Sequence, residues 1–209
     1  MIGYYDYTVL LTYMSFASGI CGIICAINGN PLAAVICLMF SGLCDMFDGR
    51  VARTKKNRTK DERQFGVQLD SLADLVCFGV LPSLIGFSLG IKAAYLVPLL
   101  IFYPLAALIR LAYFNVLEIN INSNTPVKCY TVLPVTSSAL IFPFLFIFRN
   151  LVGKYFVLLY GIMLFIIGVL FISKIQIKKP SLKVMIGFII VGVIEIIAIM
   201  VARLLGWNI

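Results

Sequence analysis

The chain has 209 residues, of which 62% are hydrophobic and only 12% are charged, and its formal net charge is +8. With a mean hydropathy of +1.05, a soluble domain of this length would have too little polar side-chain area to cover its surface. The composition therefore excludes an ordinary soluble globular protein and indicates a polytopic membrane protein.

Apolar stretches of about twenty residues recur along the chain, which is the length that an α-helix needs to cross a bilayer. The sequence predicts an all-α transmembrane bundle of about seven helices, with six to eight as the range, in a single domain covering 1–209. The first stretch has no preceding basic segment and no clear cleavage site, so we expect it to remain as a span. The predicted spans are Val9–Ile27, Pro31–Ala52, Gly66–Ile85, Ala93–Val116, Thr131–Phe148, Tyr155–Ser173 and Leu182–Leu205.

Thirteen of the 17 Lys and Arg residues fall on one side of these predicted spans, mostly within 50–63 and 174–183. Because the cytoplasmic loops of membrane proteins carry an excess of Lys and Arg, we expect the N-terminus and the connections 54–65 and 174–181 to face the cytoplasm. Such a basic face also suits anionic membrane lipids.

The second and third spans carry four carboxylates, at Asp45, Asp48, Asp70 and Asp74. A carboxylate within the bilayer is costly unless it is paired or binds a cation. The spacings of three and four place each pair on one helix face, so two neighbouring helices would point all four carboxylates at one another. Like charges this close need compensation, and hard divalent cations prefer oxygen ligands. The pattern predicts a site for two divalent cations, Mg²⁺ or Mn²⁺, bridged by the aspartates.

Small residues and an arginine accompany these acids. Gly49, Ala52 and Gly66 would let a ligand or a neighbouring backbone approach closely. Arg53 lies at the predicted membrane edge, where its forked guanidinium suits a phosphate, although a purely structural, snorkelling arginine is the alternative. Since the chain has no histidine, acid–base chemistry would use carboxylates. Metals, carboxylates and an arginine at the cytoplasmic face together indicate phosphoryl transfer, with a carboxylate as general base.

Eight of these positions together resemble the signature of the CDP-alcohol phosphatidyltransferases, membrane enzymes that displace CMP from a CDP-linked lipid with an alcohol. Twelve residues separate the arginine from the next glycine of the signature, where the commonest form has eight, and we expect the extra residues in the charged loop 54–64. The matching positions are Asp45, Asp48, Gly49, Ala52, Arg53, Gly66, Asp70 and Asp74.

The resemblance implies a role for each of these residues. It implies that Asp74 acts as the base on the acceptor hydroxyl, a choice over Asp70 that the residues alone do not make. The metal site that it implies consists of Asp45, Asp48, Asp70 and Asp74. The implied CDP-lipid site consists of Gly49, Ala52, Arg53 and Gly66. The family also implies a homodimer, and the predicted topology places the active site at the cytoplasmic face of the cell membrane.

The segment 69–82, Leu-Asp-Ser-Leu-Ala-Asp-Leu-Val-Cys-Phe-Gly-Val-Leu-Pro, resembles the phosphatidylserine synthase branch of this family. A weaker match follows at 110–115, where Tyr113 replaces an arginine, and the resemblance extends to about Ala139 although Val132 replaces a glycine. It implies L-serine as the acceptor and phosphatidylserine and CMP as the products.

A serine acceptor would need a cationic partner for its carboxylate. Arg110 and Lys128 flank the fourth predicted loop and are the candidates, with Asn115 and Thr131 able to bind the amino group or the hydroxyl. Each of these residues could equally be a topology marker.

Two other functions compete with this interpretation. Within the family the acceptor could be glycerol phosphate or inositol phosphate, which would require a more basic acceptor site than the sequence shows. A divalent-cation transporter would also keep aspartates in its helices. It would not need the Gly-x2-Ala-Arg spacing around a nucleotide, and no nucleic-acid partner is expected.

Overall fold

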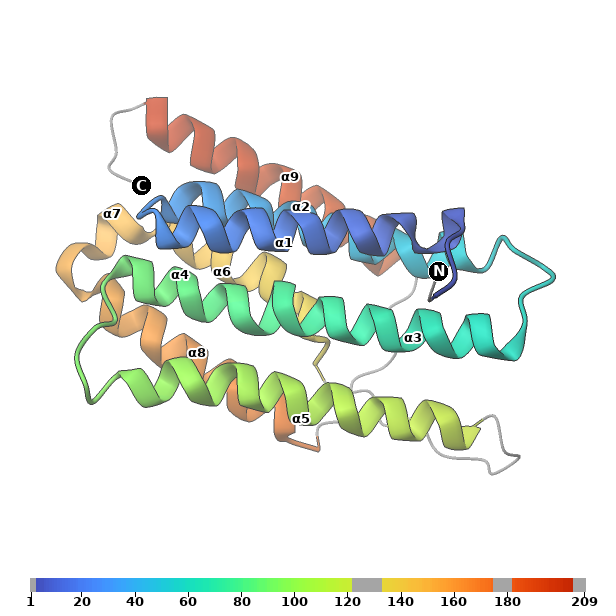
Figure 1. Ribbon diagram of the computed structural model, residues 1–209. Coiled ribbons are helices and arrows are strands. Elements are labelled where there is room, and N and C mark those ends of the chain that lie inside the picture. The colour runs from blue at the N-terminus through green and yellow to red at the C-terminus, as the bar shows by residue number, and fades with distance from the viewer. Residues whose placement is uncertain (1–2, 122–132, 175–181, 205–209) are drawn as a thin grey trace.

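The structure is a computed structural model that describes residues 3–121, 133–174 and 182–204. Within these residues all regular structure is helical, and the long helices lie side by side along a common direction (Figure 1). The α-helices are α1 (Leu10–Ile27), α2 (Pro31–Ala52), α3 (Lys60–Asp74), α4 (Leu81–Leu89), α5 (Val97–Ile121), α6 (Ser138–Ile147), α7 (Arg149–Val152), α8 (Phe156–Ile172) and α9 (Leu182–Leu204).

Five helical segments of the described chain are long and apolar enough to cross a membrane, and two shorter apolar helices accompany them. The predicted all-α membrane bundle is therefore confirmed, and the protein is an integral membrane protein. The five long segments are Tyr7–Ile27, Pro31–Ala52, Lys60–Leu89, Val97–Leu117 and Arg149–Ile172, and the shorter ones are Val135–Ile147 and Gly187–Val201.

Hydroxyl groups in α1 hold this helix against α2. Ser15 and Ser41 each donate to the other's backbone carbonyl, at 3.1 and 2.8 Å, and Ser18 donates to the carbonyl of Cys37 at 2.9 Å. Inside a bilayer, small polar residues join helices well because they allow close backbone approach and satisfy their own polarity. These hydrogen bonds therefore hold α1 and α2 together as a pair of closely packed helices.

The third span begins earlier than the predicted residue Gly66. Thr59 caps α3 through a capping box, in which its hydroxyl accepts from the backbone N–H of Glu62 and the Glu62 carboxylate accepts from the N–H of Thr59. The helix therefore starts at Lys60, and the expected loop 54–64 is limited to the residues before it. The Thr-x-x-Glu pattern is a known sequence signal for such a start, and it marks this one.

A π-helical segment, Leu75–Val80, follows Asp74 directly and joins α3 to α4 in one continuous span. It is held on both sides. A Cβ added to Gly19 of α1 would collide with Cys77, and one added to Gly79 would lie 3.3 Å from Ala107 of α5. The π segment thus packs closely against both α1 and α5.

Aromatic residues fill the centre of the bundle. Tyr103, Phe142 and Tyr160 are fully buried, and the ring of Phe142 contacts those of both tyrosines. The hydroxyl of Tyr103 donates to the carbonyl of Phe78 at 3.0 Å, and that of Tyr160 donates to the carbonyl of Pro82 at 2.9 Å. Both acceptors belong to the third span, so this aromatic group holds that span in position.

The first described residues and the connection between α2 and α3 lie at the same end of the bundle (Figure 1). Lys55 forms ion pairs with Asp6 at 2.7 Å and with Glu62 at 3.1 Å, and the hydroxyls of Tyr7 and Thr54 are 3.2 Å apart. The predicted placement of these two segments on one side is confirmed. The predicted connection 174–181 lies almost wholly outside the described residues.

Candidate active site

The four aspartates meet between α2 and α3. Asp45 interacts with Asp74, and Asp48 interacts with Asp70, so that two carboxylates of one helix face two of the other. One oxygen from each of Asp45, Asp70 and Asp74 lies within 4.8 Å of the others. The structure therefore confirms that the acids predicted to converge do so, and it brings three of them close enough to share an ion.

Asp48 is buried, with an exposed fraction of 7%. Its Oδ2 accepts a 3.0 Å hydrogen bond from the hydroxyl of Thr12 in α1. Sequence reasoning did not identify Thr12. The available signal was a row of hydroxyl residues, Thr8, Thr12 and Ser15, at helical spacing in an otherwise apolar span.

The space beside Asp48 is open. A Cβ added to Gly49 would meet no atom within 4 Å, whereas one added to Gly42, two turns earlier, would collide with Ala139. Gly42 is therefore a packing glycine, and Gly49 borders free space next to the acids. Ala52 ends α2 and is half-buried, and Arg53 follows it with an exposed side chain.

Gly66 lies one turn before Asp70 on α3, and the space at Gly66 is occupied by a side chain that sequence reasoning did not single out. A Cβ at Gly66 would collide with Nη2 of Arg58 and would lie 3.4 Å from its Cζ. Arg58 belongs to the connection between α2 and α3, and its side chain folds back over the helix that follows.

Arg110 lies within α5, well inside the apolar segment Val97–Leu117, and not beside a loop. The expectation that it flanks the fourth loop is therefore wrong, because the helix continues to Ile121. Its guanidinium interacts attractively with Asp74 and stacks near the ring of Phe114, 4.9 Å from the centroid. The Nε of Arg110 is buried and, among the described residues, has no hydrogen-bond partner.

Asn115, one turn further along α5, is hydrogen-bonded to α3. Its Oδ1 accepts from Ser71 at 2.8 Å and its Nδ2 donates to Gln68 at 3.3 Å. These bonds attach α5 to the helix that carries Asp70. The other two candidates for serine binding, Lys128 and Thr131, lie outside the described residues.

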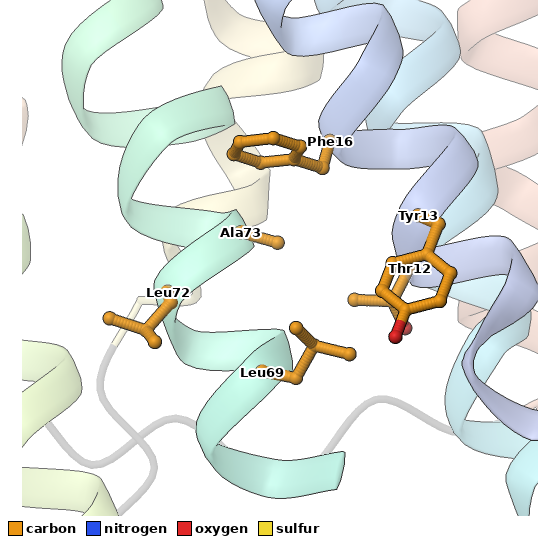
Figure 2. A pocket seen from close by; sticks show the side chains of 6 residues that line it. All are labelled: Thr12, Tyr13, Phe16, Leu69, Leu72 and Ala73. Carbon is orange, nitrogen blue, oxygen red and sulfur yellow. The ribbon is translucent and has the colours of Figure 1, made fainter. Parts of the chain in front are cut away.

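An apolar groove of about 320 Å³ lies between α1 and α3 (Figure 2). Tyr13, Phe16 and Leu72 line it with exposed side chains, and Thr12, which holds Asp48, forms part of its wall. Thr12 therefore contacts both the groove and the acidic group. The remaining lining residues are Leu69 and Ala73.

The donor set fits a hard cation. Asp45, Asp70 and Asp74 present carboxylate oxygens alone, and oxygen ligands favour Mg²⁺ and Mn²⁺ over softer metals. The nearby Asp48 adds a fourth carboxylate that Thr12 keeps oriented. A metal ion could therefore be held here, and it would offset the repulsion among the acids.

The model of one protein family, CDP-alcohol phosphatidyltransferase, matches residues 8–173. The chain belongs to this family. The match includes α2 and α3, which carry the four aspartates, and α5. The group of aspartates described above therefore lies within the part of the chain that matches the family. The resemblance expected from the eight signature positions is confirmed.

Several relatives bear the names of serine-accepting enzymes. The chain is 32% identical over 171 residues to the archaetidylserine synthase of Methanothermobacter thermautotrophicus, covering 80% of this chain and 67% of that enzyme. It is 31% identical over 188 residues to the CDP-diacylglycerol–serine O-phosphatidyltransferase of Helicobacter pylori, covering 86% and 73%.

A more local similarity is stronger. Over 76 residues the chain is 50% identical to the CDP-diacylglycerol–serine O-phosphatidyltransferase of Saccharomyces cerevisiae, which is 36% of this chain and 26% of the yeast enzyme. The matched part is thus about a quarter of the yeast protein and about two thirds to three quarters of the other two.

Proposed function

We propose that this protein transfers the phosphatidyl group of a CDP-linked lipid to the hydroxyl of L-serine and releases CMP. The lipid would be CDP-diacylglycerol or its ether-linked equivalent. The observation that carries the proposal is the group formed by Asp45, Asp70 and Asp74, whose oxygens lie within 4.8 Å of one another in a chain of this family.

The aspartates of both helices would form the metal site. Asp45, Asp48 and Asp70 would hold two divalent cations, with Asp74 completing the site. When bound, the cations would neutralise the phosphate oxygens and stabilise the charge that develops on the leaving CMP. The open space at Gly49 lies directly beside these ligands, where the diphosphate has to reach them. Ala52 and Arg53 continue this face toward the end of α2.

In the transfer step, the serine hydroxyl oxygen bonds to the phosphorus that carries the lipid. The bond between this phosphorus and the bridging oxygen of CMP breaks, and CMP leaves with the electron pair. Asp74 accepts the hydroxyl proton, because a serine hydroxyl is too weak an acid to ionise without a positioned base. Arg110 interacts attractively with Asp74 from the neighbouring helix, so it lies within reach of the same reacting groups.

The acceptor site would lie between α3 and α5. Arg110 would bind the serine carboxylate, since its buried Nε has no partner among the described residues and a guanidinium pairs well with a carboxylate. Asn115 would have to exchange one of its bonds to Gln68 or Ser71 in order to contact serine. Serine as the acceptor is supported by the names of the relatives and by the segment 69–82. Lys128 and Thr131 stay predictions, as do the homodimer and the cytoplasmic orientation of the site.

The test is an acceptor panel with purified protein. CDP-diacylglycerol and its ether-linked counterpart would each be offered with L-serine, glycerol 3-phosphate or inositol phosphate in the presence of Mg²⁺ or Mn²⁺, and CMP release would be followed. We expect release with serine and little with the phosphorylated acceptors. Faster release with either phosphorylated acceptor would overturn the serine assignment and leave the family chemistry intact. A cation transporter would release no CMP with any acceptor.

A further inference from the structure

Arg58 is not one of the eight positions of the family signature, yet its side chain lies beside one of them, Gly66. It lies in the connection between α2 and α3, it is half-buried, and its guanidinium covers Gly66 so closely that a Cβ there would collide with Nη2. The glycine therefore makes room for an arginine of the same chain.

The place of this guanidinium is set by the geometry of α3. Gly66, Asp70 and Asp74 are spaced by four residues, so they form one stripe along the helix. At 1.5 Å per residue, Gly66 lies about 6 Å before Asp70 along the helix axis. The Arg58 guanidinium thus lies about one helical turn from Asp70, toward the end of the bundle that holds the connection between α2 and α3.

Arg58 has hydrogen-bonding capacity to spare. Its Nε is buried and has no hydrogen-bond partner among the described residues. Buried donors in folded proteins are nearly always bonded, and an unbonded one calls for a ligand, an ion or water. This observation is independent of the contact with Gly66, and it points to a group that binds from outside the chain.

Contacts of residues before and after Arg58 hold the connection between α2 and α3 in place. Lys55 is tied to Asp6 at 2.7 Å and to Glu62 at 3.1 Å, and Thr59, the residue directly after Arg58, caps α3. Arg53 differs, because its side chain is exposed beyond the end of α2. Of these two arginines, Arg58 is the one that the fold holds over the acidic stripe.

We propose that Arg58 binds the diphosphate of the CDP-linked donor and that Gly66 is required because it admits the Arg58 side chain. A planar guanidinium can bond two oxygens of a phosphate at once. Bound to the diphosphate, the Arg58 guanidinium would offset part of its negative charge, and cations held by Asp70 and the neighbouring aspartates would offset the rest. The inference rests on the proposed function, since it takes a CDP-linked lipid as the donor.

The experiment measures the binding of CDP and of cytidine to the purified protein in Mg²⁺, together with the KM values for CDP-diacylglycerol and serine. The variants are Arg58→Gln, Arg58→Lys and, as the control, Lys56→Gln, which removes an exposed charge from the same connection. We expect Arg58→Gln to weaken CDP binding and raise the CDP-diacylglycerol KM by about 10- to 100-fold, as for a lost charged hydrogen bond. Cytidine binding and the serine KM should stay unchanged, Arg58→Lys should recover only part of the loss, and Lys56→Gln should resemble the wild type.

Gly66→Ala tests the second half of the proposal. The added methyl group should displace the guanidinium and weaken CDP binding, and the double variant with Arg58→Gln should bind CDP no worse than Arg58→Gln alone. Losses that add would show that Gly66 makes room for the ligand directly, and would overturn its assigned role. If Arg58→Gln does not fold, Arg58→Lys tests the same role, because it keeps the charge and removes the forked guanidinium: CDP binding should weaken while cytidine binding stays unchanged.

Two results would overturn the role of Arg58. One is unchanged CDP affinity in folded Arg58→Gln, and the other is an equal loss of cytidine and CDP affinity, which would place Arg58 on the base. Failure of the proposed function is a different result, because the wild-type protein would then bind no CDP or would release no CMP in the acceptor panel.

Discussion

The hydroxyl of Thr12 donates a 3.0 Å hydrogen bond to Oδ2 of Asp48, and this bond joins the first span to the acidic group between the second and third. It fixes the orientation of a carboxylate that is almost fully enclosed. Residues that orient a metal ligand in this way affect metal affinity without contacting the metal.

Replacing Thr12 with valine, which has nearly the same shape, should weaken metal binding. We expect Thr12→Val to lower the apparent Mg²⁺ or Mn²⁺ affinity, or the activity, by roughly 10–100-fold, as for other residues that orient metal ligands. Metal titrations of CMP release measure this. Ser18→Ala is the control, since Ser18 bonds a backbone carbonyl at the same helix interface and does not contact the acids. Equal metal dependence in both variants would contradict the prediction.

The acids should divide between metal binding and proton transfer. Transfer should stop in EDTA, and Asp45→Asn should abolish it because an amide is a weak metal ligand. Asp74→Asn should retain most CDP-lipid binding, while turnover falls by roughly 10²–10⁴-fold, the range for a lost general base. Binding of CDP-lipid and single-turnover rates separate the two effects. Near-normal transfer in EDTA would show that no divalent cation takes part.

An added methyl group should affect ligand binding at one glycine of α2 and stability at the other. Gly49→Ala should fold normally, because the methyl group meets no protein atom, and should raise the KM for the CDP-lipid if a ligand fills that space. Gly42→Ala should cost about 1–3 kcal/mol of stability through its collision with Ala139. Thermal unfolding in detergent and steady-state kinetics distinguish them. A Gly49→Ala enzyme with wild-type kinetics would mean that the open space is not used.

Arg110 should act on the acceptor and not on the donor. Removing one partner of a charged hydrogen bond costs about 1.5–3 kcal/mol, so Arg110→Gln should raise the serine KM roughly 10- to 100-fold. The CDP-lipid KM should not change, since uniform binding of one substrate appears in its own KM. Lys92→Gln, at the opposite end of the bundle, is the control. A serine KM that matches the control would remove Arg110 from the acceptor site.

The N-terminal ion pair gives a pH dependence outside the membrane. Hydrogen bonds from Lys55 and Thr8 lower the pKa of Asp6 from 3.8 to about 2. A carboxyl group with a lowered pKa stabilises the folded state fully above pH 3.8, and this contribution disappears as the pH falls through 2. Asp6→Asn should therefore make the N-terminal segment more susceptible to proteolysis at pH 6, and the difference from wild type should shrink toward pH 2. Because the pair is partly exposed, high salt should reduce the effect. Equal proteolysis of the two proteins at pH 6 would contradict the prediction.

The sequence predicted the features that depend on local pattern. Hydropathy located all seven apolar segments, and the spacings of three and four residues predicted that Asp45 and Asp48 would face Asp70 and Asp74. It did not predict contacts made between distant segments. Thr12 reaches Asp48 across 36 residues of sequence, and Arg58 reaches Gly66 from a loop that hydropathy describes only as charged. Arg110 was expected to flank the fourth loop, whereas it lies inside a span and interacts with Asp74 on another helix.

The π-helical segment Leu75–Val80 determines how the two halves of the third span are rotated relative to each other. Before it, α3 carries Asp70 and Asp74 toward α2, and after it, α4 buries Leu81 and Ile85, with Leu81 packed against Gly22 of α1. A π turn holds more residues than an α turn, and each residue rotates a helix by about 100°. Losing one residue here would convert the turn to α-helix without interrupting the span. The angle between the acidic face of α3 and the buried face of α4 therefore depends on the number of residues in this six-residue segment. We expect insertions and deletions there to disturb the site more than substitutions.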